Sequence, residues 1–205
     1  LGYSLDPDAM RLLEEARDKG IPFFVNLYYL SLLHVRVPYF AIGADMAIRD
    51  YVLYSKELVD EFGRIDCLVN SAGILIRGNA ADTGDDEWRE TMHVNLDVPF
   101  YLSRAALPYL LNTAGSIVNI ASDWGLNGGE RAASYCASKG GLVLLTKAMA
   151  KDHARDGLRV NAVCPGDVDT PMLAAEAKAT GMDIDDYLEE ACDAVPSGRV
   201  AEPEE

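Results

Sequence analysis

The chain has 205 residues, of which 49% are hydrophobic, and its 33 acidic and 18 basic residues give a formal net charge of −15. A chain of this length and apolar content can bury one sizeable core, so we expect a single domain over residues 1–205. The negative charge disfavours binding to nucleic acid or to an anionic membrane surface.

The N-terminal part of the chain predicts a helix followed by two strands. Helical periodicity covers residues 8–19, and Gly20 is a natural helix end. The apolar stretch 21–48 is interrupted by polar residues, so it never reaches the roughly 18 apolar residues of a membrane span. Strands near residues 23–30 and 35–42 are expected instead. No secretory signal is visible, and we expect a cytoplasmic protein.

Three further apolar runs have the length of buried parallel strands, and each ends in a small or polar cluster. Residues 65–70 lead into Asn70-Ser-Ala-Gly73, residues 115–121 lead into Ser122, and residues 158–164 lead into Pro165-Gly166. Helical segments separate the runs. This alternation predicts an α/β fold with a doubly wound parallel sheet, whose strand ends form a ligand-binding crevice.

Tyr135, Lys139 and Ser122 form a candidate proton-handling site at that crevice. A free tyrosine has a pKa of about 10, and a neighbouring ammonium stabilises its phenolate. Tyr135 and Lys139 are four residues apart in a helical segment, so they share a face, although this spacing alone also fits an ordinary surface pair. With Ser122, they supply the groups that move a proton to or from a substrate oxygen.

The order of the motifs resembles that of the classical short-chain dehydrogenase/reductase family. The resemblance covers residues 44–205, whereas residues 1–43 diverge. The matching pieces are Ala44-Asp45, Phe62-Gly-Arg-Ile-Asp66, Asn70-Ser-Ala-Gly73, Asn95, Ser122, Tyr135 to Lys139, Arg159-Val-Asn161, Pro165 to Thr170, Gly198-Arg199 and Pro203-Glu-Glu205.

The resemblance implies a role for each residue of the tetrad. Tyr135 would be the catalytic acid/base, and Lys139 would lower its pKa and hold the nicotinamide ribose. Ser122 would bind the substrate oxygen, and Asn95 would anchor a water in a proton relay, although Asn95 could also merely cap or kink a helix. Trp124 would line the substrate pocket, or it covers the sheet end. The resemblance also implies cofactor contacts from Asp45, Asn70, Ala72, Gly73, Pro165, Gly166, Val168 and Thr170, the last of which could simply start a helix.

One family feature has no counterpart in the sequence. No glycine-rich phosphate loop is found, and residues 8–20 resemble the helix that follows such a loop. We therefore expect the first strand, with its glycines, and the last strand to be missing. Either residues 23–30 pair where the first strand would sit, or the chain is a weakly stable partial product. Asn26 and Leu27 leave the choice between NAD and NADP open.

The function implied is NAD(P)-dependent hydride transfer between a small secondary alcohol, polyol or sugar and its ketone. The alternatives are a β-ketoacyl thioester reductase and a non-catalytic relative that binds no nucleotide.

The four cysteines and three histidines lack metal-ligand spacing, so we expect free thiols and no metal. The helices around residues 96–110 and Tyr135 are expected to form a homodimer contact rather than a tetramer.

Overall fold

The four strands that the structure describes form one parallel sheet. The computed structural model describes residues 23–26, 55–56, 58–60 and 62–203. Within these ranges the strand order is β1-β2-β3-β4, and each neighbouring pair is parallel. The strands are β1 (Phe23–Asn26), β2 (Cys67–Asn70), β3 (Ser116–Ile120) and β4 (Arg159–Val163). The strands predicted in the apolar runs 65–70, 115–121 and 158–164 are therefore confirmed as β2, β3 and β4.

The strand β1 tests the two alternatives for the N-terminal part. Phe23 pairs with Cys67 and Asn26 with Asn70, so β1 lies beside β2 in the sheet. This pairing agrees with the first alternative, in which residues 23–30 take the place of the missing first strand. The helix predicted over residues 8–19, the strand over 35–42 and Asp45 all lie outside the described residues.

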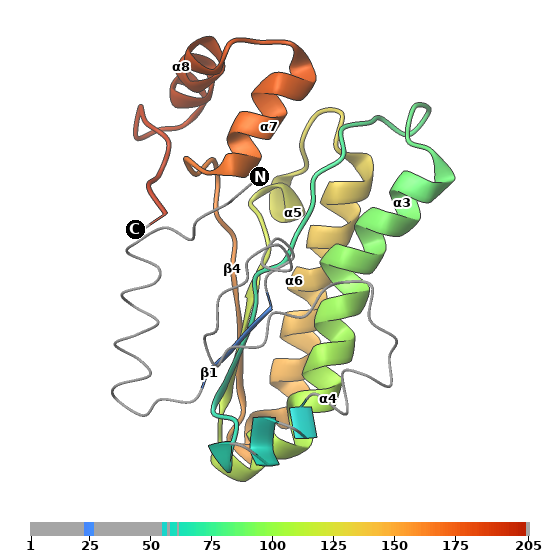
Figure 1. Cartoon of the computed structure of the whole chain (residues 1–205), viewed down its shortest axis with the longest axis vertical. Helices are drawn as coiled ribbons and strands as arrows, with labels where there is room; N and C mark the ends of the chain where they lie inside the picture. Colours follow the sequence, from blue (N-terminus) through green and yellow to red (C-terminus); the bar gives the residue numbers. More distant parts are fainter. Residues whose placement is uncertain (1–22, 27–54, 57, 61, 204–205) are drawn as a thin grey trace.

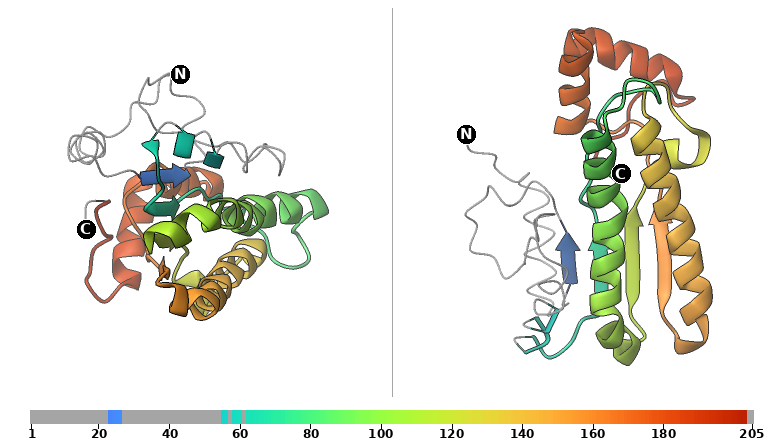
Figure 2. Two further views of the ribbon diagram at one scale, coloured as in Figure 1. Left: turned by 90° about the horizontal axis from the view of Figure 1, so that it is seen from below. Right: turned by 90° about the vertical axis from the view of Figure 1, so that its right-hand side faces the viewer.

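Helices pack along the sheet and beyond its carboxyl end. In Figure 1, α3 and α4 follow each other end to end, and α6 runs beside them. Helices α7 and α8 lie beyond the end of β4 (Figure 2, right). Helix α4 contacts β2 and β3, and α6 contacts β3 and β4. The helices are α3 (Asp85–Met92), a π-helix (His93–Asp97), α4 (Val98–Thr113), α5 (Trp124–Asn127), α6 (Ala133–His153), a 3-10 turn (Ala154–Asp156), α7 (Pro171–Thr180) and α8 (Ile184–Ala194).

The main core lies between the sheet and α4. Leu68 of β2, Ile117 of β3 and Val98, Leu102 and Leu110 of α4 are completely buried. Each such side chain contributes about 1.5–3 kcal/mol of transfer free energy to folding. Among the described residues, no helix is long and apolar enough to cross a membrane.

A network of hydrogen-bonded polar side chains crosses this core. Asn70 Nδ2 donates to Asn119 Oδ1 at 2.7 Å and to Ser103 Oγ at 3.3 Å. Asn119 Nδ2 donates in turn to Thr146 Oγ1 at 2.8 Å, and all four residues are buried. Buried amides stabilise a fold only where they are hydrogen-bonded, so this network ties β2 and β3 to α4 and α6.

We expect Asn119→Ala to destabilise the protein by about 1–3 kcal/mol, because Asn70 loses its shorter hydrogen bond inside the core. Asn161→Ala is the matched control, since Asn161 is an exposed asparagine on β4. It should change the free energy of unfolding by less than about 0.5 kcal/mol. Urea unfolding measures the free energy of unfolding of both variants. An equal decrease in the two would show that the buried network does not stabilise the fold more than an exposed asparagine does.

Candidate active site

The candidate site residues gather at the carboxyl ends of β2, β3 and β4. Ser122 follows β3, and Tyr135 and Lys139 lie in the first two turns of α6. The Asp123 N–H donates to the Pro165 carbonyl at 2.9 Å, which joins the segments after β3 and β4. Open α/β sheets bind their ligands at this edge.

Tyr135 is buried, with 8% of its surface exposed. Burial above all raises its pKa, a side-chain hydrogen bond with Ser122 opposes this, and the negative charges of Glu176 and Asp123 add to the rise. The phenol is therefore held in its protonated form at neutral pH. The effect of the Lys139 ammonium on the Tyr135 pKa during the reaction stays a prediction.

Lys139 is a buried cation beside the tyrosine. Its ammonium lies 5.7 Å from the centre of the Tyr135 ring and donates to the Ile120 carbonyl at 2.7 Å. Burial lowers the Lys139 pKa to about 8. A Cβ at Gly73 would lie 3.2 Å from Lys139 Nζ, so the glycine allows the ammonium to approach the loop after β2 closely.

Asn95 belongs to the π-helix between α3 and α4, a type of segment that occurs frequently at functional sites. Its Oδ1 accepts from the Ile74 N–H at 2.9 Å, and its Nδ2 donates to the Ile74 carbonyl at 2.9 Å and to Ser138 Oγ at 3.0 Å. The side chain thus ties the loop after β2 to α6, one residue before Lys139. Its role in a water relay stays a prediction.

Ser122 and Trp124 form one side of the site. Ser122 Oγ donates to Asp123 Oδ1 at 3.0 Å and accepts from the Trp124 N–H at 3.2 Å. The Trp124 ring meets Tyr135 edge to face, with centroids 6.0 Å apart and an angle of 89° between the rings. Leu126 is 58% exposed. Trp124 therefore contacts Tyr135, and its role as a wall of the substrate pocket stays a prediction.

The sequence-based reasoning missed Arg77 and Glu176. The Arg77 guanidinium lies over the Trp124 ring, 4.6 Å from its centre, and forms a salt bridge with Glu176 of α7. Neither residue belongs to a motif, and the two are far apart in sequence. The one feature of the sequence that could have pointed to Arg77 is its position directly after the apolar residues 74–76.

The predicted cofactor contacts differ in how well the structure supports them. The Asn70 side chain points into the core toward Asn119 and Ser103, so a contact between Asn70 and a ribose stays a prediction and would have to come from its backbone. Gly166 is exposed, and a Cβ there would meet open space. The cofactor contacts predicted for Gly73 and Gly166 stay predictions.

The remaining predicted contacts lie around these two glycines. Ala72 is buried, and Pro165 accepts the Asp123 hydrogen bond described above. Val168 forms a parallel bridge with Ala201. Thr170 stands at the N-cap position of α7 with Pro171 at the helix start, but its hydroxyl donates to the Val168 carbonyl at 3.3 Å instead of capping the helix.

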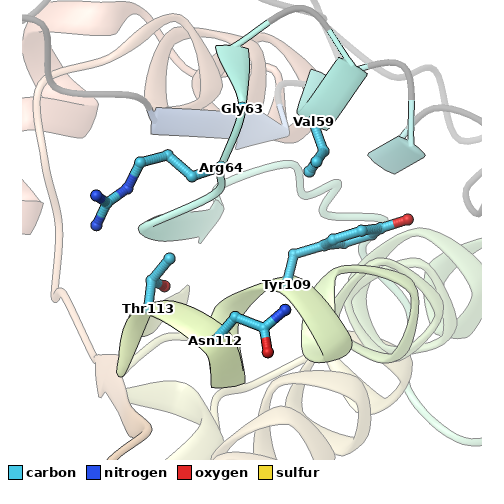
Figure 3. Close-up of a pocket in the computed structure, with 6 residues that line it drawn as sticks. All are labelled: Val59, Gly63, Arg64, Tyr109, Asn112 and Thr113. Atoms are coloured by element: carbon cyan, nitrogen blue, oxygen red, sulfur yellow. The ribbon is translucent and has the colours of Figure 1, made fainter.

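A separate pocket of about 310 Å³ lies at the opposite end of the sheet (Figure 3). Tyr109, Asn112 and Thr113 reach it from the end of α4, and Gly63 and Arg64 from the segment before β2. Ligands of such sheets bind at the carboxyl ends of the strands, so we do not assign the reaction to this pocket.

Parallel strands with packed helices and polar residues at the carboxyl edge define a Rossmann-like α/β protein. The family model described as "short chain dehydrogenase" matches residues 32–181. The chain belongs to this family.

Three similar proteins illustrate the relationship. Meso-2,3-butanediol dehydrogenase of Serratia marcescens is 42% identical over 168 residues, which are 80% of this chain and 64% of that protein. The ligand-free aldohexose dehydrogenase of Thermoplasma acidophilum has a TM-score of 0.82 at 29% identity, over 94% of this chain and 77% of the other. An NAD⁺-bound xylitol dehydrogenase has a TM-score of 0.72 at 25% identity, over 80% of this chain and 67% of the other. The chain thus spans less than two thirds of its butanediol dehydrogenase relative.

Proposed function

We propose that this protein is an NAD(P)-dependent oxidoreductase that interconverts a small secondary alcohol, polyol or sugar and its ketone. The observation that carries the proposal is the buried Tyr135, whose pKa Ser122 acts to lower and whose ring centre lies 5.7 Å from the Lys139 ammonium. These groups provide a proton, a hydroxyl and a positive charge at one point of the crevice.

Each side chain has a distinct part in the proposed reaction. A bound nicotinamide supplies the hydride chemistry. Tyr135 donates its proton to the substrate oxygen during reduction and takes it back during oxidation. Ser122 orients that oxygen by a hydrogen bond, and Lys139 holds the ribose and favours the phenolate when the proton leaves. Asn95 keeps Ile74 and Ser138 in place around this pair.

The charges around Tyr135 favour an uncharged substrate. Glu176 and Asp123 both act on the phenol, and the positive charge of Arg77 is paired with Glu176. An anionic group would meet the Asp123 carboxylate there, and Arg77 would attract it little because Glu176 already pairs with that guanidinium. The names of the similar proteins, which refer to butanediol, aldohexose and xylitol, support the same choice.

A substrate panel tests this proposal. Butane-2,3-diol, xylitol and an aldohexose would be offered with NAD⁺ and NADP⁺, and an acetoacetyl thioester with NADH and NADPH. We expect turnover with at least one neutral alcohol. Ser122→Ala, purified in parallel, controls for host dehydrogenases and should lose about 10²–10³ in kcat. A clear preference for the thioester would favour a β-ketoacyl reductase and contradict the substrate proposed here.

We further propose a cytoplasmic homodimer built on α4 and α6. Phe100 of α4 is 39% exposed and Leu144 of α6 is 66% exposed, so both helices present apolar side chains to an interface. Cys67, Cys136, Cys164 and Cys192 are all unpaired, which suits a reducing compartment.

A further inference from the structure

Arg77 connects elements that are far apart in the sequence. It lies in the loop after β2, where its Nη1 donates to the Glu130 carbonyl at 2.9 Å, ahead of α6. Its Nη2 bonds to Glu176 of α7 and, at 3.3 Å, to the Tyr187 hydroxyl of α8. One guanidinium therefore joins the loop after β2 and the entry to α6 to both helices beyond the sheet.

The Arg77 contacts form a closed cluster rather than a loose surface pair. The Tyr187 hydroxyl donates to the same Glu176 Oε2 that Arg77 binds, at 2.8 Å. The side chains of Arg77 and Glu176 are only 23% and 13% exposed. Burial, then the hydrogen bond and charge of Glu176, raises the Tyr187 pKa to about 12. Partly buried ion pairs of this kind are costly to break, because one charge is left without its partner.

The cluster also touches the catalytic tyrosine through one aromatic ring. The Arg77 guanidinium covers the Trp124 ring at 4.6 Å, and that ring meets Tyr135 edge to face at 6.0 Å. A Cβ at Gly129 would lie 2.5 Å from the Trp124 ring, so the backbone packs tightly on it as well. The Trp124 ring therefore lies in contact with both Arg77 and Tyr135.

We propose that Arg77 is a positioning residue of the active site. It fastens α7 and α8 to the loop after β2 and holds Trp124 against Tyr135, so that the substrate oxygen meets the phenol in one orientation. The kinetic part of this proposal rests on the oxidoreductase function proposed above, whereas the fastening of α7 and α8 does not.

Hydrogen exchange and kinetics of Arg77→Met test the proposal in the whole chain. We expect amide exchange in α7 and α8 to accelerate by about tenfold or more, since charge-assisted hydrogen bonds are lost. Exchange in β2 and β3 should stay as in the parent. We also expect KM for the alcohol to rise about tenfold, with a smaller change in KM for the cofactor, and Arg77→Lys to recover part of both effects.

Arg104→Met is the matched control, because Arg104 lies over Phe100 and Tyr101 of α4, at 5.3 Å from each ring. It should leave exchange in α7 and α8 unchanged. Unchanged exchange there in Arg77→Met would overturn the fastening, and accelerated exchange with unchanged kinetics would overturn the positioning role. If Arg77→Met does not fold, Glu176→Gln tests the fastening instead, and unchanged amide exchange in α7 and α8 of that variant would overturn it. A parent without turnover would refute the oxidoreductase, and exchange would still decide the fastening.

Discussion

Tyr135→Phe is expected to lower kcat by about 10²–10⁴, because the substrate oxygen loses its proton donor and acceptor. The ring itself stays, so its contact with Trp124 and the affinity for the cofactor should change little. Steady-state kinetics with the best alcohol of the panel, together with a cofactor titration, measure both quantities.

The control for this substitution is Tyr109→Phe. Tyr109 lies toward the end of α4, in the pocket at the opposite end of the sheet from Tyr135. It should keep the activity of the parent. Tyr135→Phe with kcat near that of the parent would show that the phenol does not handle the proton.

Lys139→Met should reduce both turnover and cofactor binding. Removal of one preorganised positive donor costs about 10²–10³ in kcat. Loss of charge-assisted hydrogen bonds to the ribose should weaken cofactor binding by about tenfold to a hundredfold. Lys147→Met, on an exposed position of the same helix, should leave both values unchanged. Equal cofactor affinity in the parent and Lys139→Met would refute the ribose contact.

Lys139 also predicts a specific dependence of stability on pH. Burial lowers its pKa from the ordinary value of 10.5 to about 8 in the folded protein. Between these values the unfolded chain binds more protons than the folded one, so the free energy of unfolding rises with pH. Compared with Lys139→Met, the parent should therefore gain stability from about pH 8 to 10.5. Urea unfolding of both proteins over this pH range measures the difference between their free energies of unfolding. If that difference stayed constant with pH, the Lys139 pKa would not be lowered in the folded protein.

The sheet could be predicted from the sequence because its signals are local. Each apolar run has the length of a strand and stops at a small or polar cluster, which places Ser122 and Gly166 at the same edge. The spacing of four residues places Tyr135 and Lys139 on one helix face, and the ordered motifs of the family resemblance gave both residues their roles. The strand and helix signals depend only on neighbours along the chain.

The features that the sequence did not reveal depend on contacts between distant segments. Asn70 precedes a small-residue turn, so the sequence suggested a ligand contact, but Asn119 on the neighbouring strand directs its side chain into the core. The Tyr135 pKa depends on burial and on Glu176, and the place of Glu176 depends in turn on Arg77. No local pattern encodes such partners, because side-chain pairing across elements follows from tertiary packing.

Titration of the protein with NADH and with NADPH, followed by fluorescence, tests the central claim most directly. The proposed function predicts saturable binding of at least one of the two cofactors to the parent, and weaker binding to Lys139→Met. No binding of either cofactor at millimolar concentration would contradict the claim and favour a relative that keeps the fold without binding a nucleotide.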